Sequence, residues 1–414
     1  MRIPPLSRSM IGALCLGVAS GLPLLMVLGN YAFWLAEVGI SYTQIGLLSC
    51  LGLPYSLKFI WAPFFDATPV PWLSQKVGHR RAWLMVIQPL LIFSMVLMGQ
   101  FNPVSQLTWS ALCALAVAFF SASQDIVIDA LRVEQLSERE QGLGAAMAIN
   151  GYRLGTLLAG ALGLSIAHWW GWAYAYQFIA ILLFVGQAGA FWLGENTPIN
   201  ANNDHRYSKK LWLPLKVFFQ RRNWFWLLAF IVLYKLGHSI LDVMSTPFYE
   251  AMDFTKMEVA TITKLYGFCA TVAGSLMGGW CVMRYGIFRT LFISGIAQSF
   301  SPFSYWFLAQ WGHSISGLIL TISVDHFFSQ MASIALVAYL GLMCDKRFTA
   351  SHYALFTSFA AFSRTIFGMF SGWFVEYQGW ENFFLVSFAL SLPAILMIAQ
   401  LRRQGIPQPA TQPA

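Results

Sequence analysis

Charged residues are scarce in this chain. Only 10% of its 414 residues are Asp, Glu, Lys or Arg, against roughly 25% in soluble domains, whereas 57% are hydrophobic. The six cysteines have no CxxC spacing and lie almost all in apolar stretches, which favours small buried side chains over disulfides or metal ligands. The sequence also lacks the HExxH, Walker and GxGD patterns of zinc proteases, ATP-driven proteins and intramembrane aspartyl proteases. The composition indicates a polytopic membrane protein.

Twelve apolar segments are long enough to cross a bilayer, since a spanning helix needs about 20 mostly apolar residues. The N-terminal MRIPPLSRSM enters the first segment without a small-residue cleavage site, so we expect it to lead directly into a span. One connection, 195–223, is long and polar, and it separates six spans from six. The predicted spans are 9–35, 43–64, 82–100, 107–131, 142–167, 172–194, 224–249, 258–283, 289–309, 313–342, 349–374 and 380–401.

Basic residues alternate with these spans. With the N-terminus assigned to the cytoplasm, nineteen of the 25 Lys and Arg residues fall on the cytoplasmic side, only Lys256 falls on the opposite side, and five lie inside spans. Because positive charge concentrates on the cytoplasmic side, both termini are predicted to be cytoplasmic, and the net charge of +8 needs no nucleic-acid partner. The nineteen are Arg2, Arg8, Lys76, Arg80, Arg81, Arg132, Arg139, Arg206, Lys209, Lys210, Lys216, Arg221, Arg222, Arg284, Arg289, Lys346, Arg347, Arg402 and Arg403.

The two sets of six spans resemble each other weakly. The fifth carries NGYRLGTLLAGALG and the eleventh AFSRTIFGMFSGW, and each is followed by a GW pair, so Arg153 and Arg364 are predicted counterparts. An all-α membrane protein with two six-helix halves, 1–194 and 224–414, joined by a cytoplasmic linker, 195–223, has the plan of the major facilitator fold. Asp66 with GHRR at 78–81 resembles that superfamily's cytoplasmic motif, which predicts a cytoplasmic gate of Asp66, Arg80 and Arg81.

Apart from Arg289, which is counted above on the cytoplasmic side, nine Asp, Lys and Arg residues fall inside the predicted spans. Each costs roughly 2.5–3.5 kcal/mol on insertion scales when it faces lipid at the helix centre, so such groups pair with one another or line a hydrated cavity. Pairing between helices explains any one of them, but nine spread over both halves favour a polar pathway. The nine are Asp125, Asp129, Asp242, Asp325, Lys58, Arg153, Lys235, Lys264 and Arg364.

The stretch SASQDIVIDALR, 121–132, places two carboxylates in an apolar helix. Asp125 and Asp129 are one helical turn apart on one face, and Arg132 continues that face. Burial disfavours a charged carboxylate and a nearby arginine favours it, so an Asp under both influences can gain and lose a proton. We predict Asp125 and Asp129 as proton-coupling residues, with a salt bridge to Arg132 as the alternative role of Asp129.

The remaining embedded groups are predicted to bind cargo. The guanidinium groups of Arg153 and Arg364 suit carboxylates, either of a neighbouring Asp or of a substrate. Rings such as those of Tyr31 and Trp34 can pack against a sugar, although core and interface packing explains most aromatic residues equally well. The full predicted binding set is Gln124, Tyr152, Arg153, Lys58, Lys235, Asp242, Asp325, Arg364, Tyr31 and Trp34.

Several stretches together resemble the AmpG-type muropeptide permeases. They are SGLPLLMVLG (20–29), PYSLKFIWAPFFD (54–66), GHRRAW (78–83), SASQDIVIDA (121–130), GAAMAINGYRLG (144–155) and SGWFVEYQGW (371–380). The resemblance covers most of the chain. It implies a multi-pass importer in the bacterial inner membrane that uses the proton gradient to take up N-acetylglucosamine linked to 1,6-anhydro-N-acetylmuramic acid, with or without peptide. It further implies a role in peptidoglycan recycling and in β-lactamase induction.

Other functions stay open from the sequence. The acetyl-CoA transporter family shares the Lys-Phe-x-Trp-Ala-Pro stretch at 58–63, so a major facilitator carrier of another anionic solute is the main alternative. An intramembrane enzyme lacks a supporting motif, and a sensor or scaffold usually carries an added soluble domain. We expect a monomeric transporter that is not an enzyme, binds no cofactor, metal or nucleic acid, and works with protons, lipid and a small anionic sugar-peptide.

Overall fold

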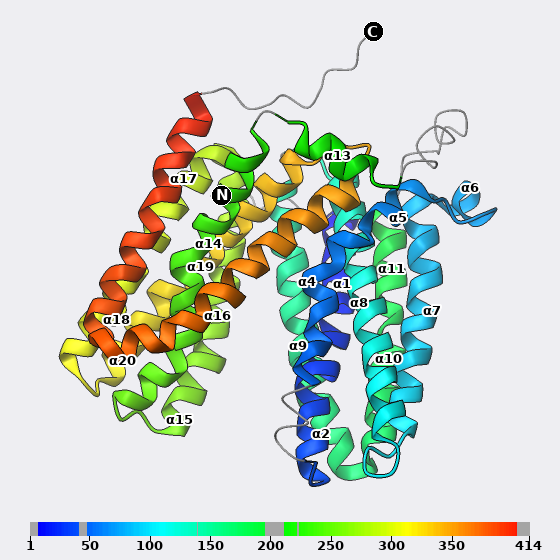
Figure 1. Cartoon of the computed structure of the whole chain (residues 1–414), viewed down its shortest axis with the longest axis horizontal. Coiled ribbons are helices and arrows are strands. Elements are labelled where there is room, and N and C mark those ends of the chain that lie inside the picture. Colours follow the sequence, from blue (N-terminus) through cyan, green and yellow to red (C-terminus); the bar gives the residue numbers. More distant parts are fainter. Residues whose placement is uncertain (1–6, 41–47, 139, 195–210, 222, 404–414) are drawn as a thin grey trace. The chain divides into compact units, whose positions relative to one another are not determined.

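The computed structural model describes residues 7–40, 48–138, 140–194, 211–221 and 223–403, and every regular element in these ranges is a helix (Figure 1). This confirms the predicted all-α class. The helices are α1 Arg8–Leu25, η1 Met26–Asn30, α2 Tyr31–Glu37, η2 Leu48–Gly52, α4 Leu53–Leu57, η3 Lys58–Ile60, α5 Ala62–Ala67, α6 Leu73–Val77, α7 His79–Gln100, α8 Leu107–Gln135, α9 Gln141–Trp170, α10 Trp172–Leu182, α11 Phe184–Leu193, α13 Leu213–Phe219, α14 Trp224–Ala251, α15 Lys256–Val259, η4 Ala260–Tyr266, α16 Gly267–Tyr285, α17 Ile287–Ser299, α18 Ser301–Trp311, α19 Ile315–Met343 and α20 Thr349–Arg403.

Within the described residues, eight helical segments are long and apolar enough to cross a membrane. They coincide with eight of the predicted spans, and the other four correspond to η2–α5, α9, α17–α18 and the first part of α20. The eight are Arg8–Glu37, His79–Gln100, Leu107–Gln135, Trp172–Leu193, Trp224–Ala251, Met257–Tyr285, Ile315–Met343 and Phe370–Ile398.

Local sequence explains where the long helices break. The second predicted span is divided by the short 3-10 turn η3, which Pro54 and Pro63 flank at the starts of α4 and α5. Helix α20 contains a kink at Gly379, whose φ of 79° is the left-handed conformation that glycine adopts without a steric penalty. The two arms of α20, orange and red in Figure 1, therefore correspond to the last two predicted spans.

The chain forms two compact units. Unit 1 contains Met1–Leu136, Met147–Val217 and Lys346–Leu355, and unit 2 contains Ser137–Ala146, Phe218–Asp345 and Phe356–Ala414. Helices α9 and α20 each begin in one unit and continue in the other. The first turn of α20 is thus part of unit 1, where it contacts residues of the candidate site below.

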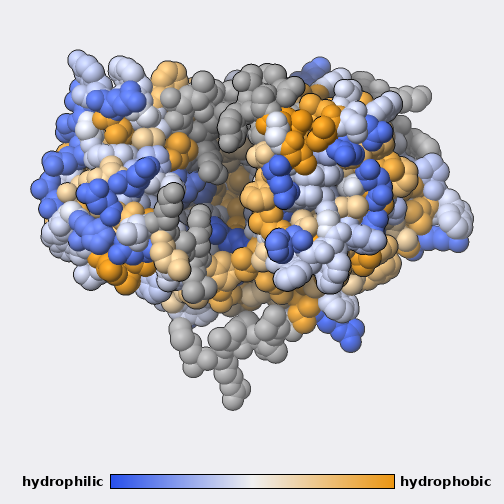
Figure 2. Space-filling view, turned by 90° about the horizontal axis from the view of Figure 1, so that it is seen from below, coloured by the Kyte–Doolittle hydropathy of each residue, from blue (hydrophilic) through white to orange (hydrophobic). Residues whose placement is uncertain are grey.

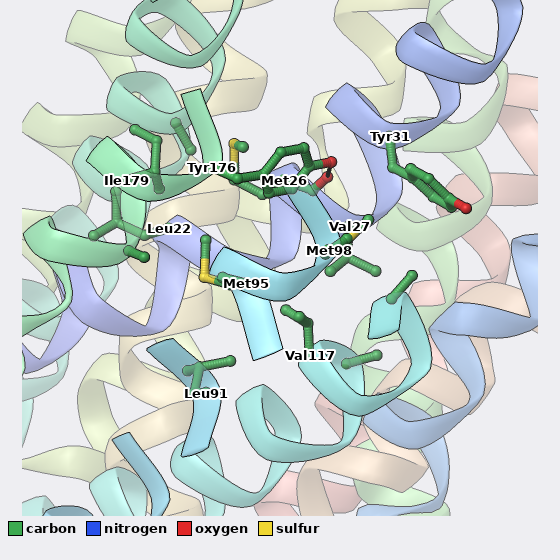
Figure 3. Close-up of a cluster of buried hydrophobic side chains, with 14 of the residues drawn as sticks. Leu22, Met26, Val27, Tyr31, Leu91, Met95, Met98, Val117, Tyr176 and Ile179 are labelled. Atoms are coloured by element: carbon green, nitrogen blue, oxygen red, sulfur yellow. Dashed lines mark hydrogen bonds between the residues drawn. The ribbon is translucent and has the colours of Figure 1, made fainter. Parts of the chain in front are cut away.

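Each unit has its own apolar core. In unit 1, side chains from α1, α7, α8 and α10 meet in a cluster that includes Leu22, Met95, Val117 and Ile179 (Figure 3). In unit 2, aromatic rings dominate, and Phe248 packs edge-to-face against Phe384 with ring centroids 4.9 Å apart. These cores hold the polar side chains that enter them in fixed positions.

Large apolar side chains also cover the outside of the helices, including Phe93, Trp109, Ile181 and Leu396. Figure 2 shows the face at the lower end of Figure 1, where hydrophilic and hydrophobic residues are interspersed. Lipid-facing helices need apolar flanks and polar ends. The surface therefore agrees with a multi-pass membrane protein.

Helices α1 and α9 approach so closely that glycine is required at the crossing. A Cβ atom on Gly21 would lie 2.1 Å from the carbonyl oxygen of Tyr152, and one on Gly151 would lie 2.1 Å from that of Leu14. We expect Gly21→Ala to lower the free energy of unfolding by about 1–3 kcal/mol, because backbone must move to admit the methyl group. Thermal unfolding in detergent measures this.

The matched control is Gly52→Ala in the same unit, where a Cβ meets nothing within 4 Å. This variant should be neutral or slightly more stable, since alanine restricts the unfolded chain. Equal unfolding temperatures for the two variants would contradict the role of the α1–α9 crossing.

Candidate functional site

Helix α8 carries a polar face made of Gln124, Asp125, Asp129 and Arg132, called here the α8 polar face. The helix packs against α1 and α7 in unit 1. Ser20 of α1 donates a hydrogen bond from its hydroxyl to Oδ1 of Asp125. Gln124 is fully buried and donates from Nε2 to the carbonyl oxygen of Ala19 at 3.0 Å. Two consecutive residues of α1 therefore hold this part of α8.

Asp129 lies between two cations. Its Oδ2 is 3.9 Å from Nζ of Lys58, and its Oδ1 is 3.7 Å from Nη2 of Arg132. The contact with Arg132 is the salt bridge given above as the alternative role of Asp129. The Asp129 side chain is 26% exposed, whereas those of Lys58 and Arg132 are 10% and 2% exposed. Both ion pairs are long, so Asp129 is not committed to either cation.

Lys58 owes its position to the broken second span. It begins η3, so the helix does not run straight past α8. A 3-10 turn within a spanning segment holds its neighbours less rigidly than an α-helix, and such turns often mark hinges. Lys58 therefore presents its ammonium group to α8 from a 3-10 turn and not from a continuous α-helix.

Arg132 is fixed from a third direction. Its Nη2 donates to the hydroxyl of Tyr353 at 2.8 Å, and its guanidinium lies over the Tyr353 ring. Tyr353 belongs to the first turns of α20 that are part of unit 1. A change in the position of this end of α20 would therefore act on Arg132 and, through it, on Asp129.

Two α9 residues complete the polar region. Tyr152 and Arg153 are both half-buried, and Thr156 donates to the carbonyl oxygen of Arg153 at 2.8 Å. Tyr152 and Asp125 both interact electrostatically with Tyr55, which precedes Lys58 by one turn. The α9 residues thus share a neighbour with the α8 polar face.

Two of the three predicted gate residues, Asp66 and Arg80, form a compact ion cluster with Glu134. Nη2 of Arg80 lies 2.6 Å from Oδ1 of Asp66 and 2.8 Å from Oε1 of Glu134. Asp66 also accepts from the backbone N–H groups of Ala350 at 3.2 Å and Ser351 at 2.8 Å, at the start of α20. The carboxylate therefore occupies the N-terminus of α20, where backbone donors attract negative charge.

Arg81 points to a different place. Its Nε donates to the carbonyl oxygen of Ala190 at 3.0 Å and its Nη2 to that of Phe191 at 2.9 Å, both in the last turn of α11. A cation at a helix C-terminus satisfies carbonyl groups that have no intrahelical partner. A gating role for Arg81 stays a prediction, and its contacts with α11 do not support it.

Unit 2 contains the other predicted binding residues. Lys235 donates to the hydroxyl of Ser333, Asp242 is exposed, and Asp325 is buried and accepts from Ser301 and Tyr305. The side chains of Arg364 and Lys264 lie outside the described residues. The predicted binding set is therefore divided between the two units.

Tyr31 and Trp34 lie in the core of unit 1. Tyr31 is 1% exposed and contacts the hydroxyl of Ser110 at 2.9 Å, and Trp34 stacks on Trp172 with centroids 5.5 Å apart. Figure 3 shows the Tyr31 ring at the edge of the apolar cluster. Their contact with cargo stays a prediction that this packing does not support.

Known proteins identify the family. Residues 10–324 match the Major Facilitator Superfamily. The chain is 36% identical to the anhydromuropeptide permease of Escherichia coli (strain K12), over 97% of this chain and 81% of that protein. It is 33% identical to the transporter AmpG 4 of Rickettsia felis, over 94% of this chain and 95% of that one. The chain belongs to the AmpG family of the major facilitator superfamily.

The fold agrees with this AmpG assignment. A bacterial homologue of the iron transporter ferroportin, in an outward-facing state, superimposes with a TM-score of 0.70 at 12% identity, covering 96% of this chain and 99% of that one. At this identity the likeness concerns the fold alone. The predicted major facilitator fold is therefore confirmed.

Several contacts of the candidate site were not predicted from the sequence. Ser20, Glu134 and Tyr353 carry no motif that singles them out, although Glu134 does lie two residues after Arg132 at the same end of α8. His238 lies between Lys235 and Asp242 on α14, and no sequence motif links it to Asp325. A spacing pattern shows which residues share a face, but it does not show what faces them from another helix.

Proposed function

We propose that this AmpG-family chain is a proton-coupled importer of anhydro-muropeptides across the bacterial inner membrane, with both termini in the cytoplasm. The proposed cargo is supported by one observation, the 36% identity over nearly the whole chain to a protein named anhydromuropeptide permease. The distribution of basic residues supports the orientation. The predicted halves 1–194 and 224–414 would carry out transport by alternating access, as in other carriers of this fold.

The proposed proton site is Asp125. Its carboxylate has one hydrogen-bond donor, Ser20, and lies one turn from Asp129, which already faces Lys58 and Arg132. Two carboxylates so close together disfavour full ionisation of both, and the less compensated one takes up a proton more readily. Asp125 is therefore the acid that changes charge during the cycle, and Asp129 stays charged between Lys58 and Arg132.

The proposed cargo-binding groups are the guanidinium groups of Arg153 and Arg364. Arg364 is included because of the sequence prediction alone. Arg153 is half-buried on α9, beside the region occupied by Tyr152 and Tyr55. Arginine binds carboxylates through two parallel hydrogen bonds, and muramic acid and peptide both carry carboxylates. Asp325 is left out of this set because its carboxylate is enclosed by its own donors.

The proposed gate is the cluster of Asp66, Arg80 and Glu134 with the start of α20. Helix α20 belongs to unit 1 only through its first turns and to unit 2 beyond them. A rigid helix cannot keep both sets of contacts when the units move relative to each other. The hydrogen bonds from Ala350 and Ser351 to Asp66 would therefore break and reform once in each transport cycle.

The decisive experiment uses purified protein in liposomes. Labelled N-acetylglucosaminyl-anhydromuramic acid, with and without peptide, is supplied outside vesicles acidified either outside or inside, and acetyl-CoA is supplied in parallel. We expect accumulation of the muropeptide only with the outside acidified. Accumulation of acetyl-CoA without the muropeptide would replace the proposed cargo, and accumulation that ignores the direction of the pH gradient would contradict proton coupling.

Lys58 is expected to set the pH range of uptake. In Lys58→Met a neutral side chain of similar length replaces the cation near Asp125 and Asp129. Without that cation the carboxylates hold protons more tightly, so the pH profile of uptake should move toward alkaline pH by about one unit. The measurement is initial uptake between about pH 5.5 and 8.5.

Lys76→Met is the matched control. Lys76 is exposed and its ammonium lies over the Trp72 ring, in the segment before α7. Its pH profile should coincide with that of the unmodified protein. If the pH profile of Lys58→Met also coincides with that of the unmodified protein, Lys58 does not influence the protonation of Asp125.

A further inference from the structure

Unit 2 encloses a second buried acid, independent of Asp125. Asp325 lies in the apolar helix α19 with its side chain 6% exposed. Its Oδ1 accepts from the hydroxyl of Ser301 at 2.9 Å, and its Oδ2 accepts from the hydroxyl of Tyr305 at 3.1 Å. Both donors lie in the first turns of α18, which begins directly after the chain bends at Phe300. The bend thus directs two hydroxyl groups at one carboxylate.

An imidazole completes this group. Nδ1 of His238, on α14, lies 3.4 Å from Oδ1 of Asp325. The His238 side chain is 17% exposed, against 6% for Asp325, so the imidazole is the more exposed member of the pair. The hydroxyl of Tyr305 is in turn 3.1 Å from that of Tyr249. Three side chains from α14 and α18 therefore contact Asp325, and Tyr249 of α14 extends this polar group inside an aromatic core.

We propose that His238 and Asp325 form a second proton-binding site of this transporter. With His238 protonated, the pair is neutral and the buried carboxylate has a counter-charge. With His238 neutral, the two hydroxyl donors still hold the carboxylate. In both states Ser301 and Tyr305 donate hydrogen bonds to the carboxylate. Histidine is the side chain that ordinarily changes charge between about pH 5 and 8. The ligand is the proton itself, so the site goes beyond the proposed cargo and does not depend on it.

Other titratable groups face the pair. His326, next to Asp325 on α19, interacts electrostatically with it, and its Nδ1 lies 3.1 Å from the carbonyl oxygen of Gly267. Tyr249 interacts with Asp325 and with Asp242, which lies one turn after His238 on α14. Lys235, one turn before His238, donates instead to Ser333. The imidazoles of His238 and His326 thus both face the Asp325 carboxylate, and Lys235 and Asp242 lie one turn to either side of His238 on α14.

Histidine ring signals in NMR test proton binding without any cargo. The chain has seven histidines, and in protein labelled with carbon-13 at histidine the signal missing from His238→Gln identifies His238. We expect this signal to shift reversibly as the pH rises from about 5 to 8.5. In Asp325→Asn the shift should occur about one pH unit or more lower, because the counter-charge is removed. A signal that is constant over this range, or one that Asp325→Asn leaves unmoved, would overturn the proposal.

Transport gives the second measurement. Exchange of labelled N-acetylglucosaminyl-anhydromuramic acid, at equal pH on both sides, should differ several-fold between about pH 6 and 8 in the unmodified protein. The difference should be at least about two-fold smaller in His238→Gln, in which Asp125 alone still titrates. The same substitution at the exposed His168 of α9 should keep the full difference. An unchanged pH dependence in His238→Gln counts against the site. If the unmodified protein exchanges no muropeptide, the proposed cargo fails, and the NMR result alone decides the proton site.

Discussion

Asp125→Asn is expected to abolish uphill accumulation of cargo while exchange of cargo across the membrane continues. Asparagine keeps the size of the side chain and can still accept the hydrogen bond of Ser20, but it cannot take up a proton. A gradient of two pH units drives at most about 100-fold accumulation when one proton accompanies each cargo molecule, since one pH unit corresponds to about 1.4 kcal/mol. In the variant, the accumulation ratio should fall to about one.

The control for this substitution is Asp253→Asn. Asp253 follows α14 with a φ of 60°, a conformation that asparagine also tolerates, and its side chain is exposed. Accumulation by this variant should match that of the unmodified protein. Asp125→Asn protein that still concentrates cargo against a gradient would remove Asp125 from the coupling mechanism, whereas loss of exchange as well would indicate a binding or folding role.

Arg80→Ala is expected to have the largest effect on stability. Arg80 is 4% exposed and faces two carboxylates at once, those of Asp66 and Glu134. Removal of the guanidinium leaves both acids in the protein interior without a cation, which costs about 3–5 kcal/mol for a buried pair. Unfolding of the protein in detergent by heat or denaturant should show this loss of stability. The yield of folded protein should also fall.

Two further variants separate charge from packing. Arg289→Ala removes an exposed arginine at the start of α17 and should change the free energy of unfolding by less than about 0.5 kcal/mol. Addition of Asp66→Asn and Glu134→Gln to Arg80→Ala should restore part of the lost stability, because the uncompensated charges are gone. A triple variant no more stable than Arg80→Ala would show that the packing of the arginine, and not its charge, holds the cluster.

Asp125 and Asp325 illustrate what helix patterns can and cannot predict. Both were recognised as embedded acids because an Asp inside an apolar run is costly wherever it lies. The pattern also placed Asp125 and Asp129 on one face, since residues four apart align on an α-helix. The pattern also predicted that Asp325 binds cargo. It could not predict the partners of Asp325, because no sequence periodicity links Ser301 or His238 to this residue. The structure shows that Asp325 is enclosed by these partners.

The sequence by itself determined the spans, the membrane location, the family and the face of α8 that carries charge. These properties depend on local hydrophobicity, on the 3.6-residue repeat and on motifs read within one segment. Only the tertiary structure decided which groups meet: Ser20 with Asp125, 105 residues apart, and Asp66 with Ser351, 285 residues apart. Such contacts arise from the way whole helices cross and rotate against each other, and that packing depends on side chains from several helices at once.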